Sequence, residues 1–136
     1  MKRALAPIPR GLPDHRNREH KNYLYAFEFA DGTVKIGVTW NPQQRAGSVY
    51  TKHKRAIVRA YVAPVVDGYR TTAERAALAS ARKIAMLMPG ETEIFVGLRF
   101  HEATHAIRQS AARLYDRRTG KALRRPHAEL AKQAAA

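Results

Sequence analysis

The sequence predicts a small α+β domain built around a three-stranded, partly antiparallel sheet that is flanked by helices. Two runs of aromatic and β-branched residues, 23–29 and 33–38, are separated by the turn residues Ala30-Asp31-Gly32, which is a strong β-hairpin signal. An alternating apolar run at 55–63 predicts the third strand. Strands and helical patterns follow one another without an internal repeat, which is typical of the α+β class.

The helices are marked by their start and stop signals. Asn41 and Pro42 form an N-cap and first helical residue, and Thr71-Thr72 opens a second helix that Pro89-Gly90 ends. A short extended piece at 93–96 precedes the last helix. The helices are therefore expected over 42–51, 72–88 and 99–117.

The chain of 136 residues is long enough for one domain, and its two ends are too polar, basic and alanine-rich to form a second core. We expect a flexible basic arm over 1–22, a folded domain over 23–116 and a basic tail over 117–136.

The composition favours a polyanionic partner. Lys and Arg number 25 against 11 Asp and Glu, a formal net charge of +14, and most of the excess lies in the two ends. Such a charge indicates nucleic acid, with DNA as the expected partner and RNA as an alternative, and an anionic membrane surface as a weaker one. The chain has no cysteine and no apolar run of about 18 residues, so we expect no membrane partner and a cytoplasmic location.

The register of the hairpin decides which side chains share a face. A two-residue Asp31-Gly32 loop would pair Glu28 with Lys35 and place Lys35 on the face opposite Tyr25. A three-residue loop with Gly32 in the left-handed conformation instead pairs Phe27 with Lys35, which puts Tyr25 and Lys35 on one face. The second register also gathers the apolar residues of both strands on the other face, so we predict it.

Tyr25, Lys35 and Arg45 then form a set that suits phosphodiester chemistry. A phenol is a poor base until a cation stabilises its phenolate, and Lys35 is placed to do so. Arg45, about one turn into the first helix, can hold a phosphate oxygen and stabilise transition-state charge. A carboxylate from elsewhere in the chain is needed to bind a divalent cation, and Glu74 is our candidate.

At these positions the sequence resembles the GIY-YIG nuclease superfamily. Tyr23-Leu24-Tyr25 stands where the family has Gly-Ile-Tyr, and Lys35-Ile36-Gly37-Val38-Thr39 resembles the Lys-Ile-Gly-x-Thr motif of a phage and bacterial branch. The spacings to Lys35 and Arg45 are also similar, and Glu74 and Glu93-Ile94-Phe95 look like later motifs of that branch. The resemblance covers roughly residues 23–110, and the chain has no asparagine after Asn41, where some members use a late one.

The resemblance implies metal-dependent hydrolysis of a nucleic-acid phosphodiester. Tyr25 would be or assist the general base, Lys35 would tune it, Arg45 would bind the scissile phosphate, and Glu74 would hold one Mg²⁺ or Mn²⁺. Gly37 and Thr39 are the structural residues of the second motif. Further contacts to nucleic acid are expected from basic residues beside this site: His53, Lys52, Lys54, Arg55 and Arg59.

Each of these residues also has an ordinary structural explanation. Tyr25 suits packing in an aromatic strand, Lys35 suits a surface pair with Glu28, and Arg45 suits a solvated helix face. Thr71-x-x-Glu74 fits a capping box, in which Glu74 needs no metal. The catalytic interpretation therefore depends on the order and spacing of the set as a whole.

A competing motif lies in the last predicted helix. His101-Glu102-Ala103-Thr104-His105 fits the His-Glu-x-x-His pattern of zinc proteases, whose histidines share one helix face. A third ligand would have to come from Asp116, His127 or Glu129, and a minimal protease does not account for the charge of +14. The alternative is an exposed helix start in which Glu102 complements the helix dipole.

The leading hypothesis from sequence is a nuclease that hydrolyses DNA. The second is a non-catalytic DNA- or RNA-binding protein on the same fold, and the third is a zinc protease.

Overall fold

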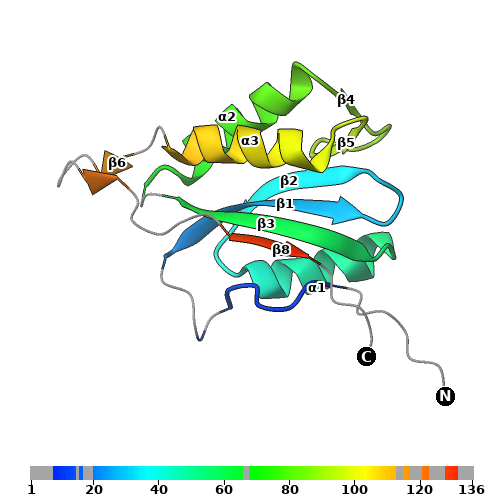
Figure 1. Cartoon of the computed structure of the whole chain (residues 1–136), viewed down its shortest axis with the longest axis horizontal. Coiled ribbons are helices and arrows are strands. Elements are labelled where there is room, and N and C mark those ends of the chain that lie inside the picture. Colours follow the sequence, from blue (N-terminus) through cyan, green and yellow to red (C-terminus); the bar gives the residue numbers. More distant parts are fainter. Residues whose placement is uncertain are drawn as a thin grey trace.

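In the computed structural model an antiparallel sheet lies between one helix on one face and a pair of helices on the other (Figure 1). It describes residues 8–14, 16, 20–65, 68–112, 115–116, 121–122 and 128–131, with side chains up to Ala111. Within these residues the sheet has six strands in the order β4-β5-β2-β1-β3-β8. The α+β class is confirmed, whereas the predicted size of three strands is wrong.

The hairpin of β1 (Asn22–Phe29) and β2 (Val34–Thr39) has the predicted register. Tyr25 pairs with Gly37, and Phe27 pairs with Lys35. The Phe29 N–H donates to the Thr33 carbonyl at 2.9 Å, which closes a loop of three residues. Gly32 has φ +88°, the left-handed conformation that the three-residue loop requires.

The helix α1 (Pro42–His53) begins as its sequence indicates. The Asn41 side-chain oxygen accepts a hydrogen bond from the Gln44 N–H at 3.0 Å, and Pro42 occupies the first turn, where its missing N–H is not needed. Lys54 ends the helix in a left-handed conformation with φ 55°.

Three short or alanine-rich strands extend the central sheet. On one side β2 pairs with β5 (Ile94–Val96), and β5 pairs with β4 (Met86–Leu87). On the other side β3 (Ile57–Val65) pairs with both β1 and β8 (Ala128–Ala131). Thus part of the predicted basic tail adds a strand to the sheet. A separate two-stranded sheet joins β6 (Tyr115–Asp116) to β7 (Lys121–Ala122).

The second helix is shorter than predicted. The helix α2 (Arg70–Arg82) begins after Tyr69 and makes no side-chain cap hydrogen bond, so the expected capping box of Thr71 and Glu74 is absent. The chain leaves the helix after Arg82 and forms β4 within the stretch predicted as helix. The last helix, α3 (Phe100–Ala112), lies beside α2 (Figure 1).

Both faces of the sheet are buried, each by a different part of the chain. Leu24, Ala26 and Ile36 face α2 and α3, in a cluster that includes Ala77 and Ile107. The alternate residues of the hairpin face α1 instead. Together with Leu12, Ala46 and Val49 they make a second cluster that contains the aromatic residues Tyr23, Tyr25, Phe27 and Phe29. The sheet therefore separates α1 from α2 and α3.

Part of the predicted N-terminal arm belongs to this second cluster. Leu12 is 3% exposed, and the Pro13 carbonyl accepts a hydrogen bond from the Gln43 N–H at 3.0 Å. This segment runs along α1 (Figure 1). The prediction of a free arm is therefore wrong for these residues. Among the described residues, every helix is too short or too polar to cross a bilayer.

Candidate functional site

Tyr25 occupies the centre of the α1 face of the sheet. Its side chain is 0% exposed, and its ring stacks on Phe27 with the centroids 4.2 Å apart. The end of the ring lies directly over Gly37, where an added Cβ would come within 2.6 Å of the Tyr25 Cζ. The glycine predicted as a structural residue is thus what allows the phenol to lie across β2.

Lys35 and Arg45 meet at this phenol, from β2 and α1 respectively. The Lys35 Nζ lies 6.0 Å from the centroid of the Tyr25 ring, and the Arg45 guanidinium donates to the Tyr25 hydroxyl at 3.5 Å. The predicted common face of Tyr25 and Lys35 is confirmed. Arg45 reaches the Tyr25 hydroxyl because the start of α1 is held in place. Thr39, just before the helix, is buried, and its hydroxyl accepts a hydrogen bond from the Asn41 N–H at 3.1 Å.

Burial keeps Tyr25 protonated. Removal of the hydroxyl from water raises the pKa of Tyr25 above its ordinary value of 10.0, and this outweighs the charges of Lys35 and Arg45, which lower it. Lys35 thus favours the phenolate, as expected from the sequence, but its effect on the pKa of Tyr25 is smaller than that of burial. At neutral pH Tyr25 is a neutral, enclosed phenol whose oxygen holds Arg45.

A carboxylate reaches this cluster from Glu93, just before β5. The Lys35 Nζ lies 3.0 Å from the Glu93 Oε2, and the Ile36 N–H donates to the Glu93 carbonyl at 3.0 Å. Only 13% of the Lys35 side chain and 30% of the Glu93 side chain are exposed. The sequence drew attention to Glu93 only as part of Glu93-Ile94-Phe95; its contact with Lys35 depends on the pairing of β5 with β2.

Arg45 differs from Lys35, Arg55 and Arg59 in its partner. Lys35, Arg55 and Arg59 each form an ion pair with a carboxylate, whereas Arg45 makes none with any described residue. Its side chain is half-buried, and its guanidinium donates a hydrogen bond to the phenol oxygen of Tyr25. A partly desolvated guanidinium without a carboxylate is a ready binding group for an anion.

Glu74 does not join this cluster. It lies on α2, whose buried residues Ala73, Ala77 and Ala81 pack on the opposite face of the sheet from Tyr25. The prediction that Glu74 lies beside Tyr25 is therefore wrong. Among the described residues, no group of three His, Asp or Glu side chains is close enough to hold a metal ion.

Arg59 also lies on the other face. It donates to the Glu28 carboxylate at 3.2 Å and sits 4.2 Å from the centroid of the Phe100 ring on α3. Its position opposite Glu28 in the β1–β3 register explains this placement. Arg59 is thus a packing and ion-pair residue of the α3 face and does not extend the site.

The remaining predicted basic residues cluster at the tip of the hairpin. The His53 ring lies 5.8 Å from the Phe29 ring centroid, and burial lowers the pKa of His53 below its ordinary 6.5, so it is neutral at pH 7. Arg55 donates to the Asp31 carboxylate at 2.8 Å. Lys52 and Lys54 are exposed at the end of α1. Lys52, Lys54 and Arg55 thus form a basic edge at the tip of the hairpin.

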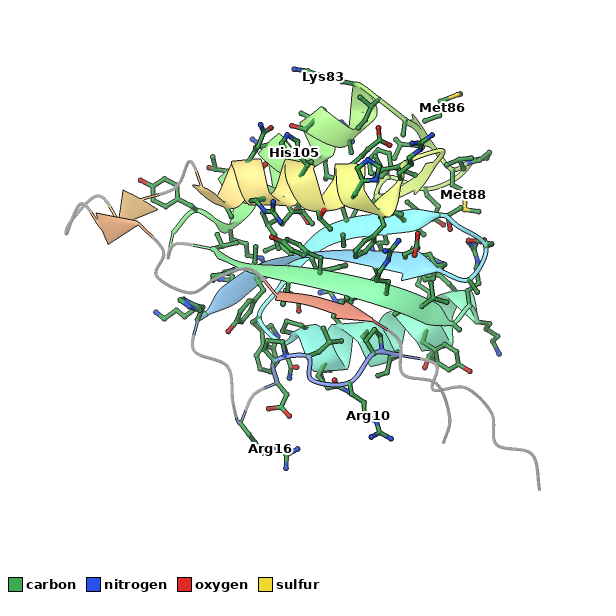
Figure 2. The ribbon with its side chains drawn as sticks, in the orientation of Figure 1. Arg10, Arg16, Lys83, Met86, Met88 and His105 are labelled. Atoms are coloured by element: carbon green, nitrogen blue, oxygen red, sulfur yellow. The ribbon has the colours of Figure 1, made fainter. Side chains whose placement is uncertain are left out.

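The competing zinc motif has a structural explanation in this fold. The Glu102 Oε1 accepts a hydrogen bond from the Arg99 N–H at 2.9 Å, so Glu102 caps the start of α3. His101 and His105 are exposed, and His105 lies on α3, away from the hairpin cluster (Figure 2). Of the proposed third ligands, His127 and the side chains of Asp116 and Glu129 lie outside the described part.

Comparisons with known proteins do not change this description of the site. A scan of protein-family models, a search of curated proteins and a search of solved structures find no match to the chain.

Proposed function

We propose that the protein is a nuclease that hydrolyses phosphodiester bonds in DNA with the help of one divalent cation, and that Tyr25, Lys35, Arg45 and Glu93 form its site. The observation that supports this most is the half-buried guanidinium of Arg45, held by Tyr25 and lacking a carboxylate among the described residues. A phosphate oxygen is the anion that such a group binds best in a protein of charge +14.

Arg45, Lys35 and Tyr25 then each have a defined role in the proposed site. Arg45 binds a non-bridging oxygen of the scissile phosphate and stabilises the charge that grows there in the transition state. Lys35 lies on the same face and supplies a second cation when its ion pair with Glu93 opens. Tyr25 acts as a positioning residue, because its enclosed neutral hydroxyl fixes the guanidinium without itself meeting substrate.

The residues of the proposed site suit a divalent cation that takes few of its ligands from the protein. Mg²⁺ is commonly held by one or two carboxylates together with substrate phosphate oxygens and water. Glu93 is the carboxylate that contacts the cluster, so it takes the place proposed from sequence for Glu74. A bound Mg²⁺ or Mn²⁺ would supply an activated water as the nucleophile and neutralise charge on the phosphate.

A second candidate is a nucleic-acid-binding protein of the same fold without catalysis. The complete burial of Tyr25 favours it, since the tyrosine expected from sequence as the base is closed off from solvent. In this case Arg45 and the basic edge of the hairpin would hold phosphates only. The missing cysteines fit a reducing compartment, so we place either function in the cytoplasm.

A pair of matched carboxamide variants tests the proposal. Plasmid nicking in Mg²⁺ is measured for the parent chain, Glu93→Gln and Glu74→Gln, each checked for folding by circular dichroism. We expect Glu93→Gln to lose at least about 100-fold in rate, as expected for a residue that acts on the transition state, and Glu74→Gln to cleave like the parent.

Two results would count against this assignment. Loss of cleavage in Glu74→Gln with retention in Glu93→Gln would return the carboxylate role to α2. Salt-sensitive binding of DNA by the parent without product in Mg²⁺ or Mn²⁺ would favour the non-catalytic candidate.

A further inference from the structure

We propose that Glu93 controls the charge offered to nucleic acid, because it neutralises Lys35 until a divalent cation draws it away. The cation and the nucleic acid would then bind cooperatively at one site. This inference rests on the proposed phosphate site and adds to it a mechanism of regulation.

The contact between the two side chains is the first step of the argument. Lys35 and Glu93 approach to 3.0 Å, and Lys35 is largely enclosed, with 13% of its side chain exposed. In such surroundings the pair is screened less by water than a surface pair. The ammonium is therefore mostly committed to Glu93 and only weakly available to a phosphate.

The backbone around Glu93 holds this arrangement in place. The Ile36 N–H donates to the Glu93 carbonyl, and Lys35 pairs with Ile94 in the β2–β5 register. The two side chains thus stay adjacent when their ion pair opens.

The exchange of Lys35 for a divalent cation at Glu93 changes the positive charge that the cluster offers to a phosphate. With the ion pair closed, Arg45 is the cation of the cluster that lacks a carboxylate among the described residues. A divalent cation at Glu93 frees Lys35, and a largely enclosed free ammonium then favours an anion beside it. Because coupling is reciprocal, a cation that strengthens phosphate binding is itself bound more tightly when phosphate is present.

The test measures binding and needs no cleavage. The affinity of the full chain for a fluorescently labelled DNA duplex is measured by anisotropy with and without Ca²⁺, at matched ionic strength. We expect Ca²⁺ to raise the affinity of the parent by about fivefold or more, the usual lower range of such coupling. Glu93→Gln should bind without Ca²⁺ as tightly as the parent does with it, and should not respond to Ca²⁺.

A matched control separates this mechanism from a general loss of negative charge. Glu91→Gln removes the same charge two residues away and should keep the Ca²⁺ response. An equal gain of affinity in both variants, a Ca²⁺ response that survives in Glu93→Gln, or no response in the parent would each overturn the proposal. If Glu93→Gln fails to fold, Lys35→Gln replaces it: because this variant has no ammonium to release, its gain of affinity with Ca²⁺ should be smaller than that of the parent, and a gain as large as the parent's overturns the proposal.

Arg45→Ala distinguishes this failure from failure of the proposed function. If Arg45→Ala binds DNA as tightly as the parent, the phosphate site itself is wrong. If Arg45→Ala weakens binding while Glu93→Gln still responds to Ca²⁺, the phosphate site stands and only the control by Glu93 is wrong.

Discussion

At the residue scale, the fit of Tyr25 over Gly37 is the contact on which the cluster depends. Gly37→Ala would place a methyl group 2.6 Å from the Tyr25 Cζ, so the enclosed ring or the strand must shift. We expect a loss of roughly 1–3 kcal/mol in the free energy of unfolding, as for other overpacked sites, measured by urea denaturation.

Gly47→Ala is the matched control for this substitution. Gly47 lies within α1, and an added Cβ meets no atom within 4 Å. Because alanine favours a helix, this variant should gain up to about 1 kcal/mol. Equal effects at the two glycines would show that the tyrosine does not lie over β2 as described.

The titration of Tyr25 gives a second prediction at this scale. Burial raises the pKa of Tyr25 in the folded chain above 10.0, so the unfolded chain loses this proton first as the pH rises. The contribution of Tyr25 to stability is therefore complete below pH 10 and declines above it, by at most about 1.4 kcal/mol per pH unit.

The measurement is urea unfolding of the parent and Tyr25→Phe at a series of pH values from neutral to alkaline. The parent should lose stability more steeply above pH 10 than Tyr25→Phe, which carries no proton to lose. Parallel curves would indicate that Tyr25 ionises as freely in the folded chain as in the unfolded one.

At the element scale, the N-terminal segment of residues 8–14 packs along α1. Leu12→Ala removes a buried side chain from the α1 cluster and should lower the free energy of unfolding by about 2 kcal/mol or more. Arg10→Ala, on the same segment, should have little effect, because Arg10 is exposed and points away from α1 (Figure 2). Thermal or urea unfolding of the two variants tests the prediction, and a free arm would leave both unchanged.

The elements that sequence predicts well here are those defined by neighbouring residues. The hairpin follows from Ala30-Asp31-Gly32, and the start of α1 follows from Asn41 and Pro42, since each signal acts within a few residues. Strands β4 and β8 are different. Met86–Leu87 and Ala128–Ala131 have little β-forming character of their own and are strands because a neighbouring strand supplies their hydrogen bonds.

At the scale of the whole molecule, the same contrast explains what could be predicted of the site. Tyr25, Lys35 and Arg45 lie within one hairpin and the helix that follows, so their meeting point depends on local register alone. Glu93 is 58 residues from Lys35 in the chain, and only the pairing of β5 with β2 brings them together. Glu74 was predicted from its place in the order of motifs, but α2 packs on the opposite face of the sheet.

If Arg45 binds the scissile phosphate, as we propose, two arginine variants should differ in plasmid cleavage. Arg75 is exposed on α2, so Arg75→Ala removes the same charge from the other side of the sheet. In Mg²⁺ we expect the parent and Arg75→Ala to cleave at similar rates, and Arg45→Ala to lose about 100-fold or more in rate. Cleavage by Arg45→Ala at the rate of the parent, or an equal loss in both variants, would contradict it.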